Sequence, residues 1–239
     1  HLIKKHKETT KIVCFNPDDP LNYNKAASNK EIKNAIKYFD HYFIWSKKLV
    51  DEISKINKNV SFLSFAADRE FVKIEDYKNL YEISFIGNGD KERSYWINSL
   101  SKYSDININV FGNGYNIGSH VTLNPAIYGP NYFVAMGRSK ININILRKQN
   151  KGSTNMRTYE IPAMGKFMLH EYSEEAMEVF RPEKEAVYFK TPEELYDKCK
   201  YYLTHETERE NIAMKAYNRT ISKNLFYELR VEQIKKELG

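Results

Sequence analysis

The sequence contains few cysteines, and they fall into no motif. Its 239 residues include two, Cys14 and Cys199, which lie far apart and lack the short spacing of metal ligands. Free thiols are typical of proteins in a reducing compartment. The cysteines therefore favour a cytoplasmic protein and provide no metal site.

Long apolar runs are also lacking. No run approaches the roughly 18 residues that a helix needs to cross a bilayer, so we expect no membrane span. Residues 1–10 are basic and polar and lack the apolar core of a secretory signal. The chain begins without methionine, which is typical of a processed or trimmed piece of a longer protein.

A dense basic patch is missing as well, although the net charge is +6. A positive chain suits nucleic acid, an anionic membrane or a phosphate-bearing small ligand. Lysine and arginine are interspersed with aspartate and glutamate throughout, and no basic stripe alternates with aromatic residues. This distribution argues against a dedicated nucleic-acid module.

The sequence does contain a regular alternation of short apolar runs and amphipathic stretches, which is typical of parallel α/β folds. A first series has three expected strands and is too small for a whole Rossmann domain. A second series has five, after a linker-like segment at 66–79. The expected strands are 11–15, 41–45 and 60–65, then 82–86, 106–111, 141–146, 166–170 and 186–189.

We therefore predict an α/β fold with a Rossmann-like parallel sheet preceded by part of a second Rossmann-like domain. Residues 1–78 would form the partial domain with its linker, residues 79–222 the complete domain, and residues 223–239 a terminal helix.

Two glycine turns each follow an expected strand of the second series. Glycine there lets the backbone approach a ligand closely, and the next helix N-terminus attracts phosphate. Short glycine turns also end strands in many α/β proteins, so each turn is a hypothesis with a structural alternative. The turn residues are Gly87, Asn88 and Gly89, and Gly112, Asn113 and Gly114.

The segment 150–171 is the richest in candidate ligands. A helix is expected to start around Asn155 to Thr158, with Arg157 in its first turn and Glu160 three residues on. An arginine fork suits a diphosphate, and a carboxylate suits the hydroxyls of a ribose. The alternative is a plain capped helix in which the negative charge of Glu160 interacts favourably with the positive end of the helix dipole. His170, at the end of an expected strand, is the histidine that lies where a ligand could be.

Paired carboxylates occur at Asp18 and Asp19, in a turn rich in proline and asparagine. Ordinary turn chemistry explains such residues. The functional alternative makes one of them a general base or a ligand of an acceptor hydroxyl.

These segments resemble a known family. The run RTYEIPAMGKFMLHEYSEEAMEVFRPEKEAVYF, followed by TPEELYDKCKYYLTHETERENIA, looks like the carboxy-terminal half of CgeB-like (spore-maturation-type) glycosyltransferases, which are GT-B enzymes. The order NPDDP, YFDHYFIWSKKLVDEI, VSFLSFAADREF and ISFIGNGDKERSYWINSL is similar to the same family. The resemblance covers about 11–224.

The resemblance implies two Rossmann-like domains, an acceptor-side one of which residues 1–78 are the tail and a donor-side one at 79–222. The terminal helix would cross back to the first domain. Glu160 matches the glutamate that contacts the nucleotide ribose, and Arg157 lies in the loop-to-helix segment beside the donor. The turn at 87–89, together with Arg93, matches the part near the donor diphosphate. Asp18 and Asp19 match an acidic turn near the cleft.

One position departs from related retaining enzymes, which carry two glutamates eight positions apart. The residue eight before Glu160 is Gly152. This leaves the contact to the donor sugar, and the choice between retention and inversion, open.

The expected function is transfer of a hexose-like sugar from a nucleoside diphosphate to an unknown acceptor, with no metal and no cofactor besides the donor. Arginines and helix N-termini would stabilise the departing diphosphate. Two alternatives stay open: a non-catalytic nucleotide or sugar-phosphate binding module, and a glycosyltransferase directed to DNA, which the charge alone suggests.

If Glu160 holds the ribose, Glu160→Gln will weaken donor binding by about 1–3 kcal/mol, because a charged hydrogen bond is lost. Calorimetric titration with donor measures this, and urea unfolding will show a much smaller change in stability. Unchanged affinity with reduced stability would make Glu160 a helix-start residue only.

Overall fold

The computed structural model describes residues 10–22, 29–70, 72, 75 and 77–239. The chain divides into two compact units, His1–Phe65 with Glu228–Gly239, and Ala66–Tyr227. The expected boundaries, after 78 and after 222, differ from these by 13 and 5 residues (78 − 65 and 227 − 222). Positions 71, 73–74 and 76 of the expected linker lie outside the described residues.

The first unit contains a three-stranded parallel sheet of order β1-β2-β3. All four residues of the central strand are buried, and the edge strands are more exposed. This confirms the three strands expected there, each shorter than expected. The elements are β1 (Val13–Asn16), α2 (Lys30–Ala35), a 3₁₀ turn (Ile36–Tyr38), β2 (His41–Ile44), α3 (Lys47–Ser54) and β3 (Val60–Phe62).

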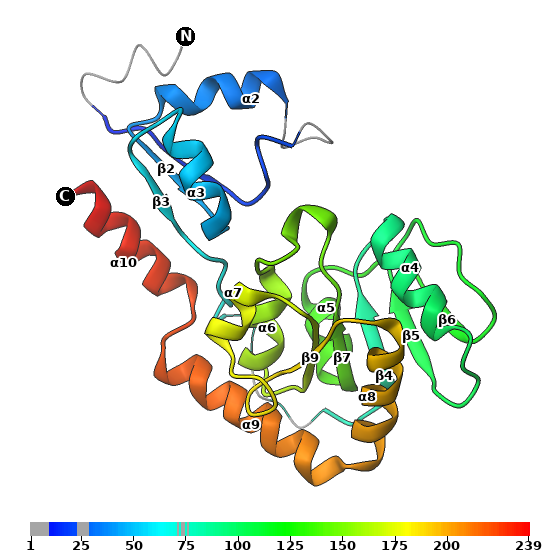
Figure 1. Ribbon diagram of the computed structural model, residues 1–239. Helices are drawn as coiled ribbons and strands as arrows, with labels where there is room; N and C mark the ends of the chain where they lie inside the picture. The colour runs from blue at the N-terminus through cyan, green and yellow to red at the C-terminus, as the bar shows by residue number, and fades with distance from the viewer. Residues whose placement is uncertain (1–9, 23–28, 71, 73–74, 76) are drawn as a thin grey trace. The chain divides into compact units, whose positions relative to one another are not determined.

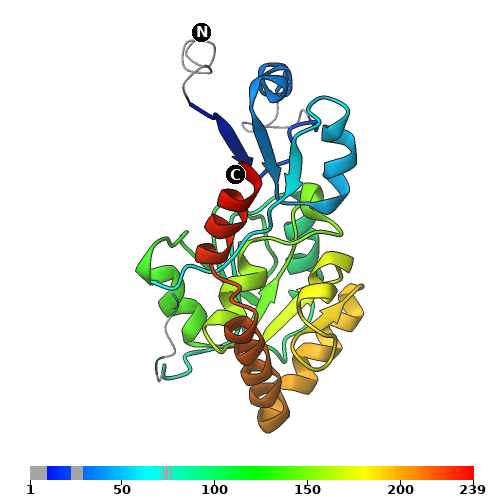
Figure 2. The same ribbon diagram turned by 90° about the vertical axis from the view of Figure 1, so that its left-hand side faces the viewer.

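The terminal helix α10 (Tyr227–Leu238) belongs almost entirely to the first unit. The buried guanidinium of Arg230 donates to the carbonyl oxygen of Phe65, and Lys11 donates to the carbonyl of Leu238. Figure 2 shows the end of α10 beside β1. Segments from the two ends of the chain thus form one unit.

The second unit is built on a six-stranded, wholly parallel sheet of order β6-β5-β4-β7-β8-β9. Numbered within the unit, this is the Rossmann order 3-2-1-4-5-6. The strands are β4 (Tyr81–Ile86), β5 (Ile108–Phe111), β6 (Val121–Asn124), β7 (Ser139–Asn144), β8 (Met168–Glu171) and β9 (Val187–Phe189). The predicted fold class is confirmed.

Strand β6 was not expected from the sequence. It lies at the edge of the sheet, and its two middle residues, Thr122 and Leu123, are exposed. An edge strand has a partner on one side only and a partly solvated surface, so it lacks the apolar run that marks a central parallel strand.

Helices cover both faces of this sheet (Figure 1). Helices α4 and α8 pack together on one face, and α5 and α6 lie on the other, where α9 packs on α6. Asp90 caps α4 by accepting from the Arg93 N–H, and Thr191 caps α8 before Pro192. The helices are α4 (Lys91–Leu100), α5 (Pro130–Gly137), α6 (Met156–Ala163), α7 (Glu174–Val179), α8 (Pro192–Thr204) and α9 (Glu206–Ser222).

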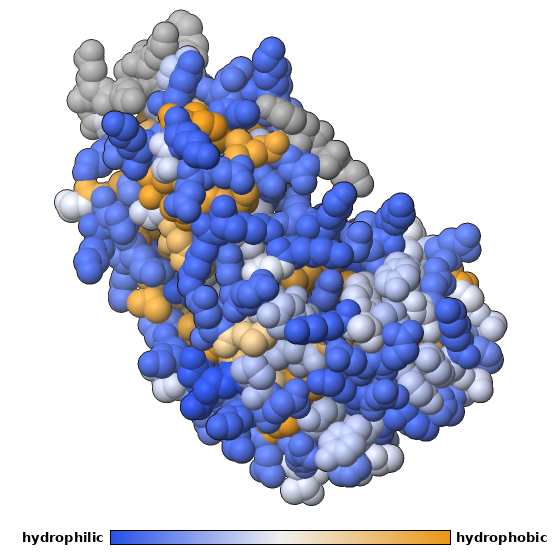
Figure 3. Space-filling view, viewed as in Figure 1, coloured by the Kyte–Doolittle hydropathy of each residue, from blue (hydrophilic) through white to orange (hydrophobic). Residues whose placement is uncertain are grey.

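The visible face of the molecule is mostly hydrophilic, with hydrophobic side chains showing among the polar ones (Figure 3). Within the part of the chain that the structure describes, no helix combines the length and apolar character needed to cross a bilayer.

The two glycine turns extend the pairing of β4 and β5 beyond the sheet. The Gly89 N–H donates to the carbonyl oxygen of Asn113 at 2.8 Å, and the Asn113 N–H donates to Oδ1 of Asn88 at 3.0 Å. A Cβ on Gly112 would lie 2.2 Å from the carbonyl oxygen of Gly87, and one on Gly89 would lie 2.5 Å from that of Gly114. Glycine is required because two backbones touch.

Gly112→Ala will therefore lower the free energy of unfolding by about 1–3 kcal/mol, the usual cost of overpacking. Urea unfolding measures the loss. Gly118→Ala is the matched control, since its Cβ would approach only the side-chain hydroxyl of Ser101, at 2.9 Å. Equal stability of the two variants would show that the turns can separate without cost.

Candidate functional site

The candidate site lies where the strand order of the second unit reverses. From β4 the chain proceeds outward to β5 and β6, and from β7 it proceeds the other way to β8 and β9. Ligands of such sheets bind beyond the carboxyl ends of the strands at this switch point. The turn after β4 and the loop that leads from β7 into α6 both lie there, as the sequence predicted.

Two arginine side chains converge at this point. Arg93, on α4, is 4% exposed, and its guanidinium donates to the carbonyl oxygens of Asn88 at 3.0 Å and Ile145 at 3.4 Å. Arg157 lies in the first turn of α6. A Cβ on Gly87 would lie 3.3 Å from Nη2 of Arg157 and 3.4 Å from Nη1 of Arg93. Both guanidinium groups therefore rest against Gly87.

Direct ion pairs are lacking at this pair in the described part of the chain, although the carboxylates of Asp90 and Glu160 act on it at longer range. Within the described residues, neither Arg93 nor Arg157 forms an ion pair, and the buried Nε of Arg157 has no hydrogen-bond partner. Burial, together with the neighbouring charges of Arg157 and Arg147, lowers the pKa of Arg93 to about 10, against the opposing charge of Asp90. Arg93 therefore remains charged at neutral pH, and two adjacent guanidinium groups are suited to an anion.

Glu160 lies next to Arg157 on the same helix and accepts a hydrogen bond from the hydroxyl of Tyr132, with 2.5 Å between Oη and Oε2. Burial raises the pKa of Glu160, against the opposing effects of the Tyr132 hydrogen bond and the Arg157 charge. The Arg157 guanidinium lies 5.7 Å from the centre of the Tyr132 ring. Glu160 is beyond the first turn of α6, so stabilisation of the helix N-terminus does not explain it.

Tyr132 was missed by the sequence analysis. It lies on α5, 28 residues before Glu160, and no motif spacing connects the two. Tyr115 was also missed; its hydroxyl donates to the carbonyl oxygen of Gly87 at 2.8 Å and so supports the turn.

The residues predicted at the start of α6 hold that helix in place. Asn155 caps it by accepting from the Thr158 N–H at 3.1 Å, and its side-chain amide exchanges hydrogen bonds with Asn144. Thr158 is fully buried, and its hydroxyl is 2.9 Å from Nε2 of His170. The side chains of Asn155 and Thr158 therefore act on the site through α6 rather than by facing a ligand.

His170 is part of the same buried network. Burial lowers its pKa to about 4. The neutral ring donates from Nδ1 to the carbonyl oxygen of Glu171 and accepts from Thr158 at Nε2. His170 thus links β8 to α6 and is fully buried.

The glycine turns contribute differently from the sequence expectation. The backbone there was expected to approach a ligand closely, but the N–H groups of Gly87, Gly89, Gly112 and Asn113 already donate to protein oxygens. Gly87 of the first turn therefore lies against the two guanidinium groups, and the second turn supports the first. Gly114, with φ +81°, completes the second turn in the left-handed region.

The acidic turn at Asp18 and Asp19 lies in the first unit. Asp19 Oδ1 accepts from the Leu21 N–H at 2.9 Å, and the Asp18 N–H donates to Oδ1 of Asn16 at 2.9 Å. These are the side-chain bonds of ordinary Asx turns. A role as catalytic base stays a prediction.

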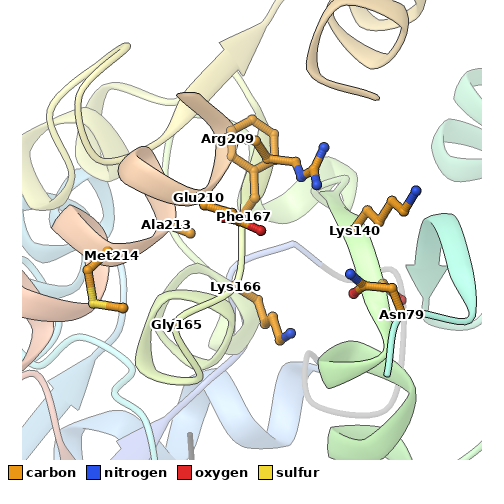
Figure 4. A pocket seen from close by; sticks show the side chains of 10 residues that line it. Asn79, Lys140, Gly165, Lys166, Phe167, Arg209, Glu210, Ala213 and Met214 are labelled. Atoms are coloured by element: carbon orange, nitrogen blue, oxygen red, sulfur yellow. The ribbon is translucent and has the colours of Figure 1, made fainter. Parts of the chain in front are cut away.

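A cavity of about 260 Å³ opens at the other end of the sheet (Figure 4). Ser139, the first residue of β7, and Phe167, just before β8, line it together with Lys140, Lys166 and Arg209. It is at the amino ends of the strands and is separate from the candidate site. Within the described ranges, no cluster of three or more His, Cys, Asp or Glu side chains could hold a metal ion.

Residues 93–236 match a family described as glycosyl transferase-like. The chain belongs to this family. The match includes Arg93, Arg157 and Glu160 and thus most of the candidate site. No curated protein matches the sequence.

Solved structures share the fold at low sequence identity. TarM of S. aureus is 12% identical, with a TM-score of 0.71 over 100% of this chain and 52% of its own. Anabaena HepE, solved with UDP-glucose, is 11% identical (TM-score 0.72, 95% of this chain and 71% of its own). Sucrose-phosphate synthase from Thermosynechococcus elongatus is 10% identical (TM-score 0.71, 98% and 69%).

These likenesses show a GT-B glycosyltransferase fold. The chain spans about half the length of TarM and about 70% of the other two.

The buried His170 predicts a pH-dependent stability. Its pKa is about 4 in the folded protein and near 6.5 when unfolded, so the unfolded chain binds the proton more tightly. The free energy of unfolding will fall as pH decreases from about 6.5 to 4, by up to about 1.4 kcal/mol per pH unit. Urea unfolding at several pH values will show this slope reduced in His170→Gln and kept in His205→Gln, an exposed control. Parallel profiles for His170→Gln and the unaltered protein would contradict the assignment.

Proposed function

We propose that this chain carries the donor-binding part of a cytoplasmic GT-B glycosyltransferase of the CgeB-like type. It transfers a sugar from a nucleoside diphosphate to an acceptor. The observation that carries the proposal is the convergence of Arg93 and Arg157 on Gly87 at the switch point of the sheet. Two guanidinium groups that form no direct ion pair in the described structure suit the two phosphates of such a donor.

Glu160 is assigned to the ribose of the donor. Its carboxylate lies on the same helix as Arg157, one turn further along, so one ligand can reach both. In dinucleotide-binding Rossmann folds, an acidic side chain accepts hydrogen bonds from the ribose hydroxyls. The proposed order along the ligand is therefore diphosphate at the arginines and nucleoside toward Glu160.

The proposed catalysis depends on stabilising the charge of the leaving group. As the bond between sugar and diphosphate breaks, negative charge develops on the leaving diphosphate, and fixed positive groups stabilise it. Arg93 and Arg157 are held by the turns and by α6 before the substrate arrives, so little reorganisation is required. This scheme assigns to arginine the role that a metal ion has in other phosphate sites.

The sugar itself has no assigned carboxylate. Gly152 occupies the position of the first glutamate in related retaining enzymes, and its φ of +78° favours glycine there. Asp18 or Asp19 is the proposed base or acceptor ligand. Transfer of labelled sugar from a donor panel by the full-length protein tests catalysis and separates it from binding alone.

A nucleoside diphosphate will stabilise the protein in the presence of a chelator. At about one hundred times the dissociation constant, linkage adds about 2.7 kcal/mol to the free energy of unfolding. Thermal and urea unfolding with UDP, GDP, ADP or CDP measure this, and the bare nucleoside will give little of it.

Arg157→Ala will remove most of that stabilisation because the diphosphate loses one of two guanidinium partners. Arg138→Ala is the matched control, since Arg138 is exposed and precedes β7 at the amino end of the sheet. A requirement for a divalent cation, or stabilisation that survives loss of both Arg93 and Arg157, would place the phosphate site elsewhere.

A further inference from the structure

Tyr132 connects the two side chains to which the proposed function assigns different parts of the donor. Its hydroxyl donates to Oε2 of Glu160 at 2.5 Å, and its ring lies 5.7 Å from the guanidinium carbon of Arg157. Tyr132 comes from α5, whereas Glu160 and Arg157 both belong to α6. One side chain from a separate helix therefore contacts the proposed ribose ligand and a proposed diphosphate ligand together.

We propose that Tyr132 is a positioning residue that determines how strictly the site selects a ribonucleotide. By holding one oxygen of Glu160, it fixes the direction in which the other oxygen accepts from a ribose hydroxyl. This inference rests on the proposed function and names a further determinant of its specificity.

The geometry engages one of the two carboxylate oxygens. Oε2 of Glu160 accepts from Tyr132, which assigns the other oxygen, Oε1, to the ligand. A glutamate side chain has three rotatable bonds, and its entropy opposes a single geometry. The Tyr132 hydrogen bond removes that freedom before the ligand binds, which strengthens a directional contact to one hydroxyl.

Tyr132 also favours the ionised form of the carboxylate. Burial raises the pKa of Glu160, and the two groups that lower it are the hydroxyl of Tyr132 from α5 and the charge of Arg157 on α6. The pKa of Tyr132 itself is raised well above its ordinary value, first by burial, so its hydroxyl remains a donor throughout the physiological range. A protonated Glu160 would lose its charged acceptor, and ribose binding would weaken.

The ring of Tyr132 has a second effect. Its face lies toward the Arg157 guanidinium, in the range of a cation–π contact. Phenylalanine keeps this face and removes the hydroxyl, so Tyr132→Phe separates the two effects within one side chain.

The test compares ribonucleotides with their deoxy forms. The dissociation constants of UDP, GDP, ADP and CDP, of their 2′-deoxy and 3′-deoxy forms, and of inorganic pyrophosphate are measured by calorimetry. The proteins are the unaltered chain, Tyr132→Phe, Glu160→Gln and the double variant. Tyr201→Phe is the matched control, because its hydroxyl also donates to a glutamate, Glu208, at 2.8 Å, but at an exposed position.

The unaltered protein will bind one of the deoxy forms about ten-fold more weakly than the ribonucleotide, the effect of a lost hydrogen bond to a charged group. Tyr132→Phe will reduce this ratio to about two-fold and leave the affinity for pyrophosphate unchanged. Glu160→Gln will reduce the same ratio, and the double variant will show no further loss, because the two residues act as a pair.

The pH dependence gives an independent measure. In Tyr132→Phe the hydroxyl that lowers the pKa of Glu160 is gone, so the carboxylate takes up its proton at a higher pH. Ribonucleotide binding will therefore weaken at a higher pH than in the unaltered protein. Tyr201→Phe will keep both the ratio and the pH profile.

Two results would overturn the inference while the proposed function stands. One is an unchanged ratio in Tyr132→Phe. The other is equal weakening of ribonucleotide, deoxynucleotide and pyrophosphate, which would show a structural role alone. If Tyr132→Phe fails to fold, an unchanged ratio in Glu160→Gln would overturn this inference together with the assignment of Glu160 to the ribose, while nucleotide binding at the arginines would still stand. Failure of the unaltered protein to bind all of the nucleotides would overturn the proposed function, and this inference with it.

Discussion

Two like charges held together in a largely buried place are the constraint on which the candidate site depends. Arg93 and Arg157 both lie against Gly87, and a side chain there would fill the space that the guanidinium groups occupy. Burial of Arg93 and the proximity of Arg157 disfavour the charged form of Arg93, as its lowered pKa shows. Such an arrangement costs stability unless an anion compensates it. In the structure, the carbonyl oxygens of Asn88 and Ile145 accept hydrogen bonds from the Arg93 guanidinium and hold it in place.

The backbone around this pair is correspondingly rigid. The turn after β4 touches the turn after β5 so closely that Gly112 has no room for a side chain. On the opposite side, Asn155 caps α6, and Thr158 is held by His170 from β8. Buried polar groups of this kind are stabilising when each has its partners. The position of Arg157 and Glu160 is thus fixed by residues that do not themselves face a ligand.

Much of the fold followed from local patterns. Short apolar runs bounded by polar turns predicted eight of the strands, and Asn155 caps α6 at the place where a helix was expected to start. Arg157 and Glu160 were found as a pair because they are three residues apart on one helix. The functional meaning of the glycine turns was less accessible, since the N–H group of Gly87 bonds to Phe111 at the end of β5 and that of Gly89 to Asn113 in the neighbouring turn.

The sequence by itself thus determined the alternation of strands and helices, the start of α6 and the presence of Arg157 and Glu160 on that helix. These features depend on residues a few positions apart, whose backbone preferences and side-chain contacts are local. Only the tertiary structure decided that β6 forms an edge strand, that α10 joins the unit of residues 1–65, and that Tyr132 meets Glu160. Each of these depends on packing between segments distant in the chain, and no local pattern records which distant surfaces will be buried together.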